Sequence, residues 1–600
     1  MYFQNYNPFD NVFLSTLVAA IPIAALLYFI ALHPHRDKAG NKHLGISAPY
    51  AAFYGVLVAF IVSCLAFKMP IASAVSAFAY GSLSGFLGII WIVLGAMFLY
   101  TMTVITGKFE IVKESIIHIS FDRRLQVLLI AFSFGAIIEG TSGFGTPVAI
   151  AGAVMVGLGF SPFQSAVLNL LANTAPVAWG AIGTPIVTLA AVSGLDQVTL
   201  SAMAGRQLPF CSVIVPFWLV ATFVKMEKGT WKEAFEVWPA CLVSGGSFAV
   251  MQWFASAYPP THLMTDVVSG VFSVICTALF LTFVWHPKKR FLLQSERAAA
   301  GGAHEVDAST AKTWKYPYTV GQTVYAWVPW AILILCCALW GVKGWKTGLN
   351  NVFKDTKIDS SFLGSKLAGT ASLPTWEMPA LHLKVQRTPP VVKAGEKPEK
   401  AVFGMNYLSA AGTGVFFAAI LSGLVLGMSG AQWKEATLRT AKRMKTPVLV
   451  ITQVLGLGYL TRYSGTDAVL GLAFTNAGFM YPFFAAYLGW LGVFLTGSDT
   501  ASNALFGSLQ RITAQQLHLN EILIVATNST GGVMGKMIDA QSIMVACAAC
   551  YEDPQERNHA LGPIFRTVWW HSIAGAAVIG IIAMLQAYVF TGMIPIPPLK

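Results

Sequence analysis

The chain has 600 residues, of which 55% are hydrophobic and only 11% are charged. Soluble globular domains carry roughly 25% charged residues, so this composition excludes a soluble fold and predicts an all-α, polytopic membrane protein. The net charge of +12 does not indicate nucleic acid as a partner. The basic residues instead cluster in short loops between apolar stretches, as expected beside a lipid bilayer.

The apolar stretches predict about twelve transmembrane helices, since about 20 apolar residues cross a bilayer. No basic residue precedes the first stretch, so it does not resemble a signal peptide and should remain as a helix. The predicted crossings are 10–32, 47–67, 86–106, 163–190, 207–224, 237–255, 264–285, 323–342, 404–427, 446–461, 520–545 and 568–594. The apolar regions 126–160 and 480–505 are left over, and we expect each to form a re-entrant hairpin.

Loops rich in Lys and Arg set the orientation, because such loops stay in the cytoplasm. They lie at 36–42, 108–124, 225–232, 288–290, 439–445 and 557–566. With twelve crossings, all of them fall on one side of the membrane. The sequence therefore predicts that both termini lie outside.

The layout predicts two repeats of opposite orientation, each with two crossings on either side of its hairpin. An N-terminal helix and cytoplasmic loop (1–46) precede the first repeat, 47–224, which contains hairpin 126–160. Linking helices (225–342) follow, and the second repeat, 404–600, contains hairpin 480–505. Inverted repeats of this kind place the substrate near the membrane midplane, at the repeat interface.

The segment 343–403 differs from the rest of the chain. It contains ten Lys or Arg residues, five prolines and few apolar runs. Long loops cross the membrane largely regardless of charge, so we expect an extracytoplasmic insertion. We expect it to be flexible and dispensable for transport.

Each predicted hairpin contains a stretch that is poorly suited to a membrane helix. The first is 139–147, with a carboxylate, glycines, hydroxyls and a proline, and the second is 496–503. Broken backbone at membrane depth is tolerated where protein buries it or where it lines a cavity, and paired breaks point to a transporter's binding site. The candidate substrate-binding residues at these breaks are Gly140, Thr141, Ser142, Gly143, Gly497 and Ser498.

Two polar pairs at matching places in the repeats, Asn173–Thr174 and Asn528–Ser529, are further substrate-binding candidates. Amide and hydroxyl groups can hydrogen-bond a carboxylate, and a helix that restarts after a break presents free N–H groups to an anion. The alternative is that these pairs join helices together. Lys536 lies near the face of Asn528 and could pair with a substrate carboxylate or with Asp539.

Glu139 and Asp499 are the candidate proton carriers. An intramembrane carboxylate is by default a functional candidate, and a buried carboxyl can exchange a proton near neutral pH. The alternative is a structural pair with Lys or Arg, but the sequence offers Glu139 no local partner. Seven of the eight cysteines lie within apolar stretches, so no disulfide framework, metal site, catalytic group or cofactor is predicted.

These motifs resemble the lactate permease family. The stretches that carry the resemblance are GAIIEGTSGFGTPVAIAGAVMVGLGF (135–160), ANTAPVAWGAIGTPI (172–186), TGSDTASNALFG (496–507) and ATNSTGGVMGKMIDAQSI (526–543). The resemblance implies a symporter that imports lactate and glycolate with protons across the cytoplasmic (inner) membrane of a prokaryote.

Other functions stay open at this point. The chain could carry another small organic anion, or couple transport to sodium. A membrane acyltransferase is a weaker alternative, because His118 and Asp122 do not have the HxxxxD spacing of such enzymes. A channel is weaker too, because a continuous pore does not need two broken hairpins around a central site.

Overall fold

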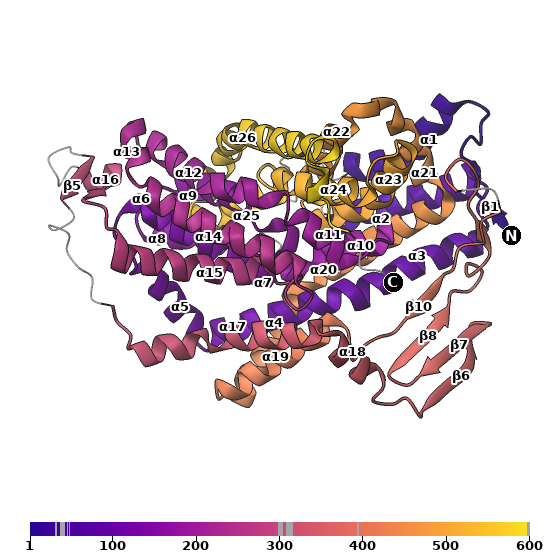
Figure 1. The fold of residues 1–600 in the computed structure, drawn as a ribbon, viewed down its shortest axis with the longest axis horizontal. Helices are drawn as coiled ribbons and strands as arrows, with labels where there is room; N and C mark the ends of the chain where they lie inside the picture. Colours follow the sequence, from indigo (N-terminus) through magenta and orange to yellow (C-terminus); the bar gives the residue numbers. More distant parts are fainter. Residues whose placement is uncertain are drawn as a thin grey trace.

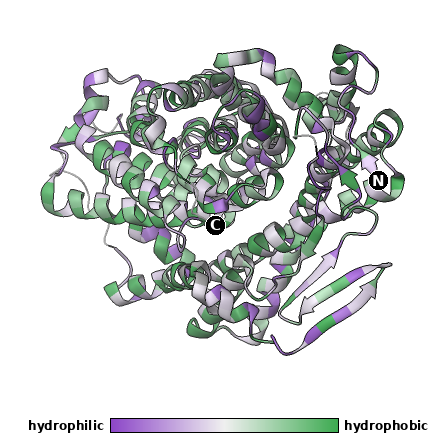
Figure 2. Ribbon diagram, turned by 45° about the vertical axis from the view of Figure 1, so that its right-hand side comes forward, coloured by the Kyte–Doolittle hydropathy of each residue, from purple (hydrophilic) through white to green (hydrophobic). Residues whose placement is uncertain are grey.

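The computed structural model describes residues 1–600 except 30–32, 37–41, 45, 47, 144, 298–303, 308–315, 393–394 and 597–600. Most of the described chain is helical, with hydrophobic side chains along the helices (Figures 1 and 2). In hydrocarbon a helix satisfies all of its backbone hydrogen bonds internally, which is why apolar sequence of this length folds in this way.

Within the described ranges, nine helical segments are long and apolar enough to cross a membrane, or ten if one bent pair counts as a span. The predicted polytopic helical class is confirmed, although this count does not reach twelve. The helices that form these segments are α2 (Ala48–Ile61), α3 (Ile71–Gly85), α4 (Trp91–Ile105), α6 (Arg123–Gln126), α7 (Gly135–Ser142), α9 (Pro162–Ala172), α10 (Gly180–Ser193), α11 (Gln197–Ala204), α12 (Leu208–Met226), α14 (Trp238–Ala257), α15 (Thr265–Leu279), α17 (Val320–Gly341), α21 (Thr466–Phe474), α22 (Tyr481–Thr496) and α26 (Pro554–Tyr588).

Two predicted crossings are broken helices. The predicted crossing 163–190 is α9 followed by α10, bent by 70°. Pro176 lies at this bend and cannot continue an α-helix. The crossing 520–545 is α24 (Glu521–Gly535) followed by α25 (Ala540–Cys550). There the side chain of Asp539 caps a new helix by accepting the Ser542 N–H at 2.7 Å.

Four other crossings differ in length from their predicted bounds. α3 and α4 form one continuous helical segment, joined by a π-helical turn, so the first of them was missed. α20 (Gly430–Ser464) has 35 residues because its first half is a polar helix that the hydropathy pattern omits. α1 (Val12–Leu27) is shorter than predicted, and α19 (Ala411–Val425) starts late because a strand precedes it.

The helices form two packed groups. In the first group, α20 packs against α2, α3 and α4, and α19 packs against α4 and α17. In the second, α22, α24 and α26 pack together with α23 (Asp499–Gln516), and α12, α14, α15 and α7 form the remainder. Figure 1 shows α3, α4, α17 and α19 of the first group as a diagonal layer below the second. Contacts of α10 with α4 and of α23 with α20 join the groups.

Outside residues 393–394, the segment 343–403 forms a helix, strands and turns, which corrects the expectation of a flexible insertion. After α18 (Lys343–Asn350), the strands β6 (Lys357–Phe362), β7 (Ser365–Thr370), β8 (Leu373–Glu377) and β10 (Val402–Gly404) form an antiparallel sheet in the order β10-β8-β7-β6. β1 (Tyr2–Phe3) pairs in parallel with β9 (Val385–Gln386). Ser73 donates to the Ala380 carbonyl at 2.7 Å, and Tyr2 donates to the Ser464 carbonyl at 2.9 Å. The β1–β9 pair and these two contacts therefore join the N-terminal segment and segment 343–403 to each other and to the helices.

Basic and extended elements lie at opposite ends of the molecule. Figure 1 shows α5 (Lys108–Ile117), α6, α13 (Trp231–Glu236) and α16 (Gln294–Arg297) at one end, and the N-terminus and sheet at the other. We call these the basic end and the sheet end. At the basic end the buried Arg124 pairs with Asp122 at 2.7 Å, and with Glu236 and Glu305 at 3.0 Å each. Two short hairpins, β2 (Pro34–Arg36) with β3 (Lys42–Leu44) and β4 (Lys289–Phe291) with β5 (Glu305–Asp307), complete the fold.

Candidate substrate and proton site

The predicted breaks lie together in the structure although they are far apart in the sequence. They line one small cavity of about 30 Å³, room for one or two water molecules. Its lining residues come from both halves of the chain: Glu139, Gly143, Val177, Gly180, Ala181, Thr184, Pro185, Gly497, Ser498, Asp499, Thr500 and Lys536.

The first break separates α7 from α8 (Thr146–Gly157). Gly143 and Gly145 have φ angles of 58° and 78°, values that glycine adopts without steric cost. Pro147 then starts α8, where its missing N–H is not needed. Thr141 donates to its own helix, to Ile137 O at 2.9 Å. The side chain of Ser142 lies outside what the structure describes.

The start of α10 is strained where it meets this break. Ala181, Ile182 and Gly183 have φ angles of 46°, 55° and 69°. Left-handed backbone costs a non-glycine residue about 1–3 kcal/mol and concentrates at functional sites. A Cβ on Gly183 would lie 2.9 Å from the Leu263 backbone. The surrounding packing therefore holds this bend in place.

The second break separates α22 from α23. Gly497 has a φ of 70°, and Ser498 caps α23 by accepting the Ala501 N–H at 3.3 Å. The first-turn N–H groups of α23 have no partners within the helix, so its N-terminus favours negative charge. Lys536 crosses from the end of α24 and donates to the Gly497 carbonyl at 2.6 Å.

Glu139 and Asp499, the predicted proton carriers, are both buried at this cavity. Glu139 Oε1 lies 2.6 Å from the position that a Cβ on Gly180 would take, so a side chain there would displace the Glu139 carboxyl. Its Oε2 has no hydrogen-bonding partner among the described residues. Asp499 Oδ2 accepts a hydrogen bond from Ser529 at 2.5 Å and another from Asn503 at 3.4 Å.

The two asparagines predicted as equivalent have different surroundings. Asn528 lies within the unbroken α24, not at a break; its amide donates to Asn503 at 2.9 Å and accepts from Gln510 at 3.1 Å. Asn173 ends α9 near Glu139, and neither of its amide atoms has a hydrogen-bonding partner at normal distance among the described residues. Thr174 donates to the Leu171 carbonyl at 2.7 Å. Asn173 is thus less engaged than Asn528 and lies beside the Glu139 carboxyl.

Lys536 and Asp539 form the buried pair that the sequence left as one alternative. Their side chains are 5% and 0% exposed, and Nζ lies 3.4 Å from Oδ2. Asp539 also caps α25. Among the described residues, no group of three or more His, Cys, Asp or Glu side chains is arranged to hold a metal ion.

The sequence analysis missed Asp266, in the first turn of α15. Its side chain is fully buried, and neither carboxyl oxygen has a hydrogen-bonding partner at normal distance among the described residues. A Cβ on Gly140, the residue after Glu139, would lie 3.0 Å from Asp266 Cβ, so Asp266 packs against α7. An acid within the apolar stretch 264–285 is itself a signal of function, and that signal could have identified this residue.

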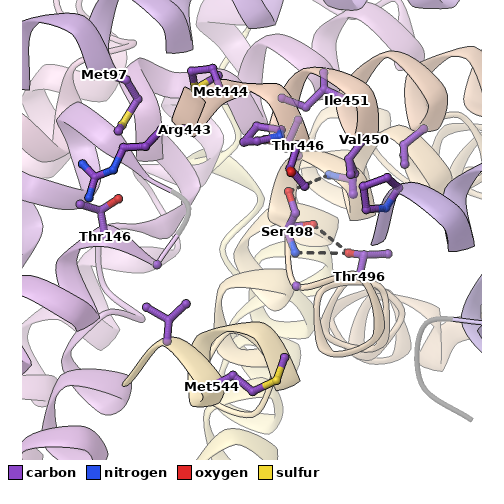
Figure 3. A pocket seen from close by; sticks show the side chains of 18 of the residues that line it. Met97, Thr146, Arg443, Met444, Thr446, Val450, Ile451, Thr496, Ser498 and Met544 are labelled. Carbon is purple, nitrogen blue, oxygen red and sulfur yellow. Dashed lines mark hydrogen bonds between the residues drawn. The ribbon is translucent and has the colours of Figure 1, made fainter. Parts of the chain in front are cut away.

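A larger cavity of about 590 Å³ adjoins the small one and shares Gly497, Ser498 and Thr500 with it. Its walls come from α4, α8, α20, α23 and α25. Figure 3 shows Arg443 and Thr146 on one side of this cavity, facing Ser498 and Thr446. The larger cavity therefore places a cation and hydroxyl groups next to the breaks.

Comparison with known proteins agrees with the transporter interpretation. The family described as L-lactate permease matches residues 15–590. Glycolate permease GlcA of Escherichia coli K12 is 45% identical over 591 residues, covering 98% of this chain and 99% of that protein. The L-lactate permeases of E. coli K12 and Bacillus subtilis 168 are 40% and 39% identical over 596 and 599 residues, with 99% of each chain covered.

Two solved structures are more distant. MtrF of Neisseria gonorrhoeae has a TM-score of 0.41 and 13% identity, over 97% of this chain and 95% of that one. YdaH of Alcanivorax borkumensis has a TM-score of 0.40 and 12% identity, over 95% and 97% of the two chains. The full-length sequence matches, together with the multi-pass helical fold, identify the chain as a member of the L-lactate permease family.

Proposed function

We propose that the protein imports lactate and glycolate by proton symport across the cytoplasmic (inner) membrane of a prokaryote. Its membership in the L-lactate permease family supports transport, and the names of its relatives support these two 2-hydroxy monocarboxylates. The relative named for glycolate is 45% identical and the E. coli relative named for L-lactate is 40% identical. Both substrates therefore belong in the first assay.

The observation that carries the proposal is the charge composition around the small cavity. Among the described residues, Lys536 is the buried cation there, while Glu139, Asp499, Asp266 and Asp539 are buried acids. A buried charge without a partner costs several kcal/mol. Asp539 already pairs with Lys536, so an arriving carboxylate needs protons on the other acids. Anion binding and proton binding are thereby coupled.

We assign the substrate carboxylate to the groups that are free or cationic at the breaks. Lys536, Asn173 and the N-terminus of α23 would hold it, and Arg443 would attract it along the larger cavity. Asn528 and Ser529 would position Asn503 and Asp499, to which they are hydrogen-bonded. The remaining proposed substrate-binding residues shape the breaks: Gly140, Thr141, Ser142, Gly143, Thr174, Gly497 and Ser498.

Glu139 and Asp499 are the proposed proton carriers. Moving one negative charge inward against an inside-negative potential costs about 2.3 kcal/mol per 100 mV. A proton carried with the anion cancels that charge. Glu139 lines the cavity with one free oxygen, so it can gain or lose a proton without breaking a hydrogen bond there.

We further propose that the chain is built from inverted repeats 47–224 and 404–600, with re-entrant hairpins 126–160 and 480–505 and twelve crossings in all. Both proposed units have the same order of breaks: a helix–break–helix hairpin followed by a broken helix, α9–α10 in one and α24–α25 in the other. The positive-inside rule puts the basic end in the cytoplasm. The units 1–46, 225–342 and 343–403 are then the N-terminal helix, the linking helices and an extracytoplasmic domain.

In this orientation the site is closed toward the outside. Arg462 donates to the Val192 carbonyl at 3.3 Å, and Arg511 donates to the Ser193 carbonyl at 2.6 Å. Both contacts hold the sheet end of α10. The larger cavity lies instead on the side of Arg443, which belongs to the basic run 439–445. We propose that the structure represents an inward-facing state.

Uptake of labelled lactate or glycolate into proteoliposomes tests the function. A proton gradient of one pH unit drives about tenfold accumulation when one proton accompanies each anion. A sodium gradient alone should drive none. Accumulation with sodium and not with protons would contradict proton symport, and accumulation of neither substrate would contradict the assigned substrate class.

A further inference from the structure

Residues 385–392 and 395–400, within the segment 343–403, form a closed loop at the sheet end that we call the strap. Its base is held by backbone hydrogen bonds: the Glu399 N–H donates to the Val385 carbonyl at 2.8 Å, and the Leu383 N–H donates to the Glu399 carbonyl at 2.9 Å. Further along, the Gln386 side chain donates to the Glu396 carbonyl at 3.0 Å. The residues near 390 therefore form the tip of the strap.

The strap is attached to α20, in the first helix group. Glu399 forms an ion pair with Arg462, on the last turn of α20, at 3.4 Å. The N-terminal segment adds a second attachment. Thr388 donates to the Gln4 carbonyl at 2.7 Å, and the Gln4 amide donates to the Arg462 carbonyl at 2.9 Å. The last carbonyls of a helix have no partners within the helix, so this bond also caps α20. We expect the strap to move together with α20.

The tip of the strap contacts the second helix group. Val391 is 7% exposed and packs against Ala468 of α21 and Ile512 of α23. Gln516, the last residue of α23, donates to the Pro390 carbonyl at 3.0 Å. Two side-chain hydrogen bonds, at 2.6 and 2.9 Å, hold α21 to α23. The strap therefore bridges the two helix groups at the sheet end.

The same two groups leave space between them further along α20. Arg443 and Met444 of α20 and Ala501 of α23 line the larger cavity, which measures about 590 Å³. Near the strap, by contrast, Arg462 donates to the Val192 carbonyl of α10 at 3.3 Å. Alternating access moves one part of a transporter against the other around a fixed site. The outward-open state then requires the two groups to separate where the strap bridges them.

We propose that the strap is the outer gate of the transporter and that Val391 holds this gate closed. The inference rests on the proposed transport function and on the orientation that puts the sheet end outside. When the site opens outward, the strap stays with α20, and Pro390 and Val391 leave α21 and α23. Val391 is a positioning residue, because it acts on the equilibrium between the two states. The segment 343–403, which we expected to be dispensable, is then part of the transport cycle.

The size of the contact at Val391 sets the expected effect of removing it. Valine has two more carbon atoms than alanine, and these are buried against α21 and α23 only while the gate is closed. Their loss in Val391→Ala should shift the equilibrium toward the open gate by roughly tenfold. The attachments of the strap to α20 do not involve this side chain and should persist in the variant.

Labelling of a single cysteine in the small cavity tests the proposal. Thr184 lines that cavity from α10, so Thr184→Cys is the reporter, in the full chain with its eight native cysteines changed to alanine. An impermeant maleimide reads outward opening in right-side-out vesicles and inward opening in inside-out vesicles. We expect Val391→Ala to raise the outside labelling rate roughly tenfold without raising the inside rate. Val402→Ala, at an exposed position of β10 in the same segment, is the matched control and should label as the parent does.

An unchanged outside labelling rate in folded Val391→Ala would overturn the gate. Equal increases from both sides would also overturn it, because a strap that only stabilises the fold would loosen both faces. An increase from the inside alone would contradict an outer gate. If Val391→Ala does not purify as a folded protein, Gln516→Ala removes the hydrogen bond to Pro390. It should raise outside labelling alone by roughly two- to tenfold, and the same three results would overturn the proposal.

The labelling experiment needs no substrate, so it is independent of the assigned function. A wild-type chain that transports neither lactate nor glycolate would contradict the proposed function. The labelling rates of the variants would still decide whether the strap is the outer gate.

Discussion

Replacing Lys536 by methionine would separate the two roles considered for this side chain. Lys536 Nζ lies 3.4 Å from Asp539 Oδ2 and donates to the Gly497 carbonyl at 2.6 Å. The first contact is a structural ion pair, and the second places the cation at the break where we expect the substrate carboxylate. Removing the charge should destabilise the fold, because buried Asp539 loses its partner. It should also weaken substrate binding, because the cation is lost.

The magnitudes of these two effects differ. Two unit charges at 3.4 Å attract by about 5 kcal/mol at an effective dielectric constant of about 20. Breaking a buried pair by removing one partner costs roughly 3–5 kcal/mol, whereas removing both charges is often nearly neutral. We therefore expect Lys536→Met to lower the free energy of unfolding by roughly 3–5 kcal/mol. The added change Asp539→Asn should recover most of that loss.

Lactate binding should not recover in the double variant. A hydrogen bond to a charged group contributes about 1.5–3 kcal/mol, so binding should weaken by roughly tenfold to 100-fold. Equilibrium unfolding in mixed detergent and calorimetric titration with lactate measure the two effects, and Asp539→Asn alone is the control. Normal lactate affinity in the double variant would show that Lys536 is structural only. Undiminished stability of Lys536→Met would refute the buried-pair argument.

Three further changes test other parts of the site and the basic end. Glu139→Gln should abolish proton-driven accumulation and retain lactate exchange, since the neutral amide cannot carry a proton. Accumulation that persists in proteoliposomes would show that Glu139 is not the proton carrier, and Asp499 would be tested next. Asn528→Ala should lower the free energy of unfolding by roughly 1–3 kcal/mol for each partner left unsatisfied. Asn173→Ala should leave the free energy of unfolding nearly unchanged and weaken lactate binding. Equal free energies of unfolding for the two variants would contradict this distinction. Burial and the neighbouring Glu236 raise the pKa of Glu305 from 4.5 to about 7. The stabilisation from its proton is therefore present below about pH 4.5 and lost as the pH rises through about 7. Hydrogen exchange of the β4–β5 hairpin should accelerate over that range in the wild type and not in Glu305→Gln, and an identical pH dependence in both would refute the assignment.

The sequence alone determined the class of the protein and the location of its breaks. Long apolar stretches allow only helices in a membrane, because each backbone polar group must find a partner within its own segment. Glycines beside Glu139 and Asp499 could be recognised as breaks because this composition is unfavourable within such a helix. The same motifs carried the resemblance to the lactate permease family, which the comparisons confirm.

Only the tertiary structure decided which of these polar groups are free. Asn173 and Asn528 occupy similar sequence contexts, yet contacts with Asn503 and Gln510 engage Asn528 alone. Those partners lie 18 to 25 residues away in the sequence, beyond what local periodicity can predict. Likewise, only the packing of α15 against α7 places Asp266 beside the helix that contains Glu139. The sheet in 343–403 escaped prediction because its strands are short and only partly buried. Their order depends on pairing between strands and on anchoring to the helices, which hydropathy does not register.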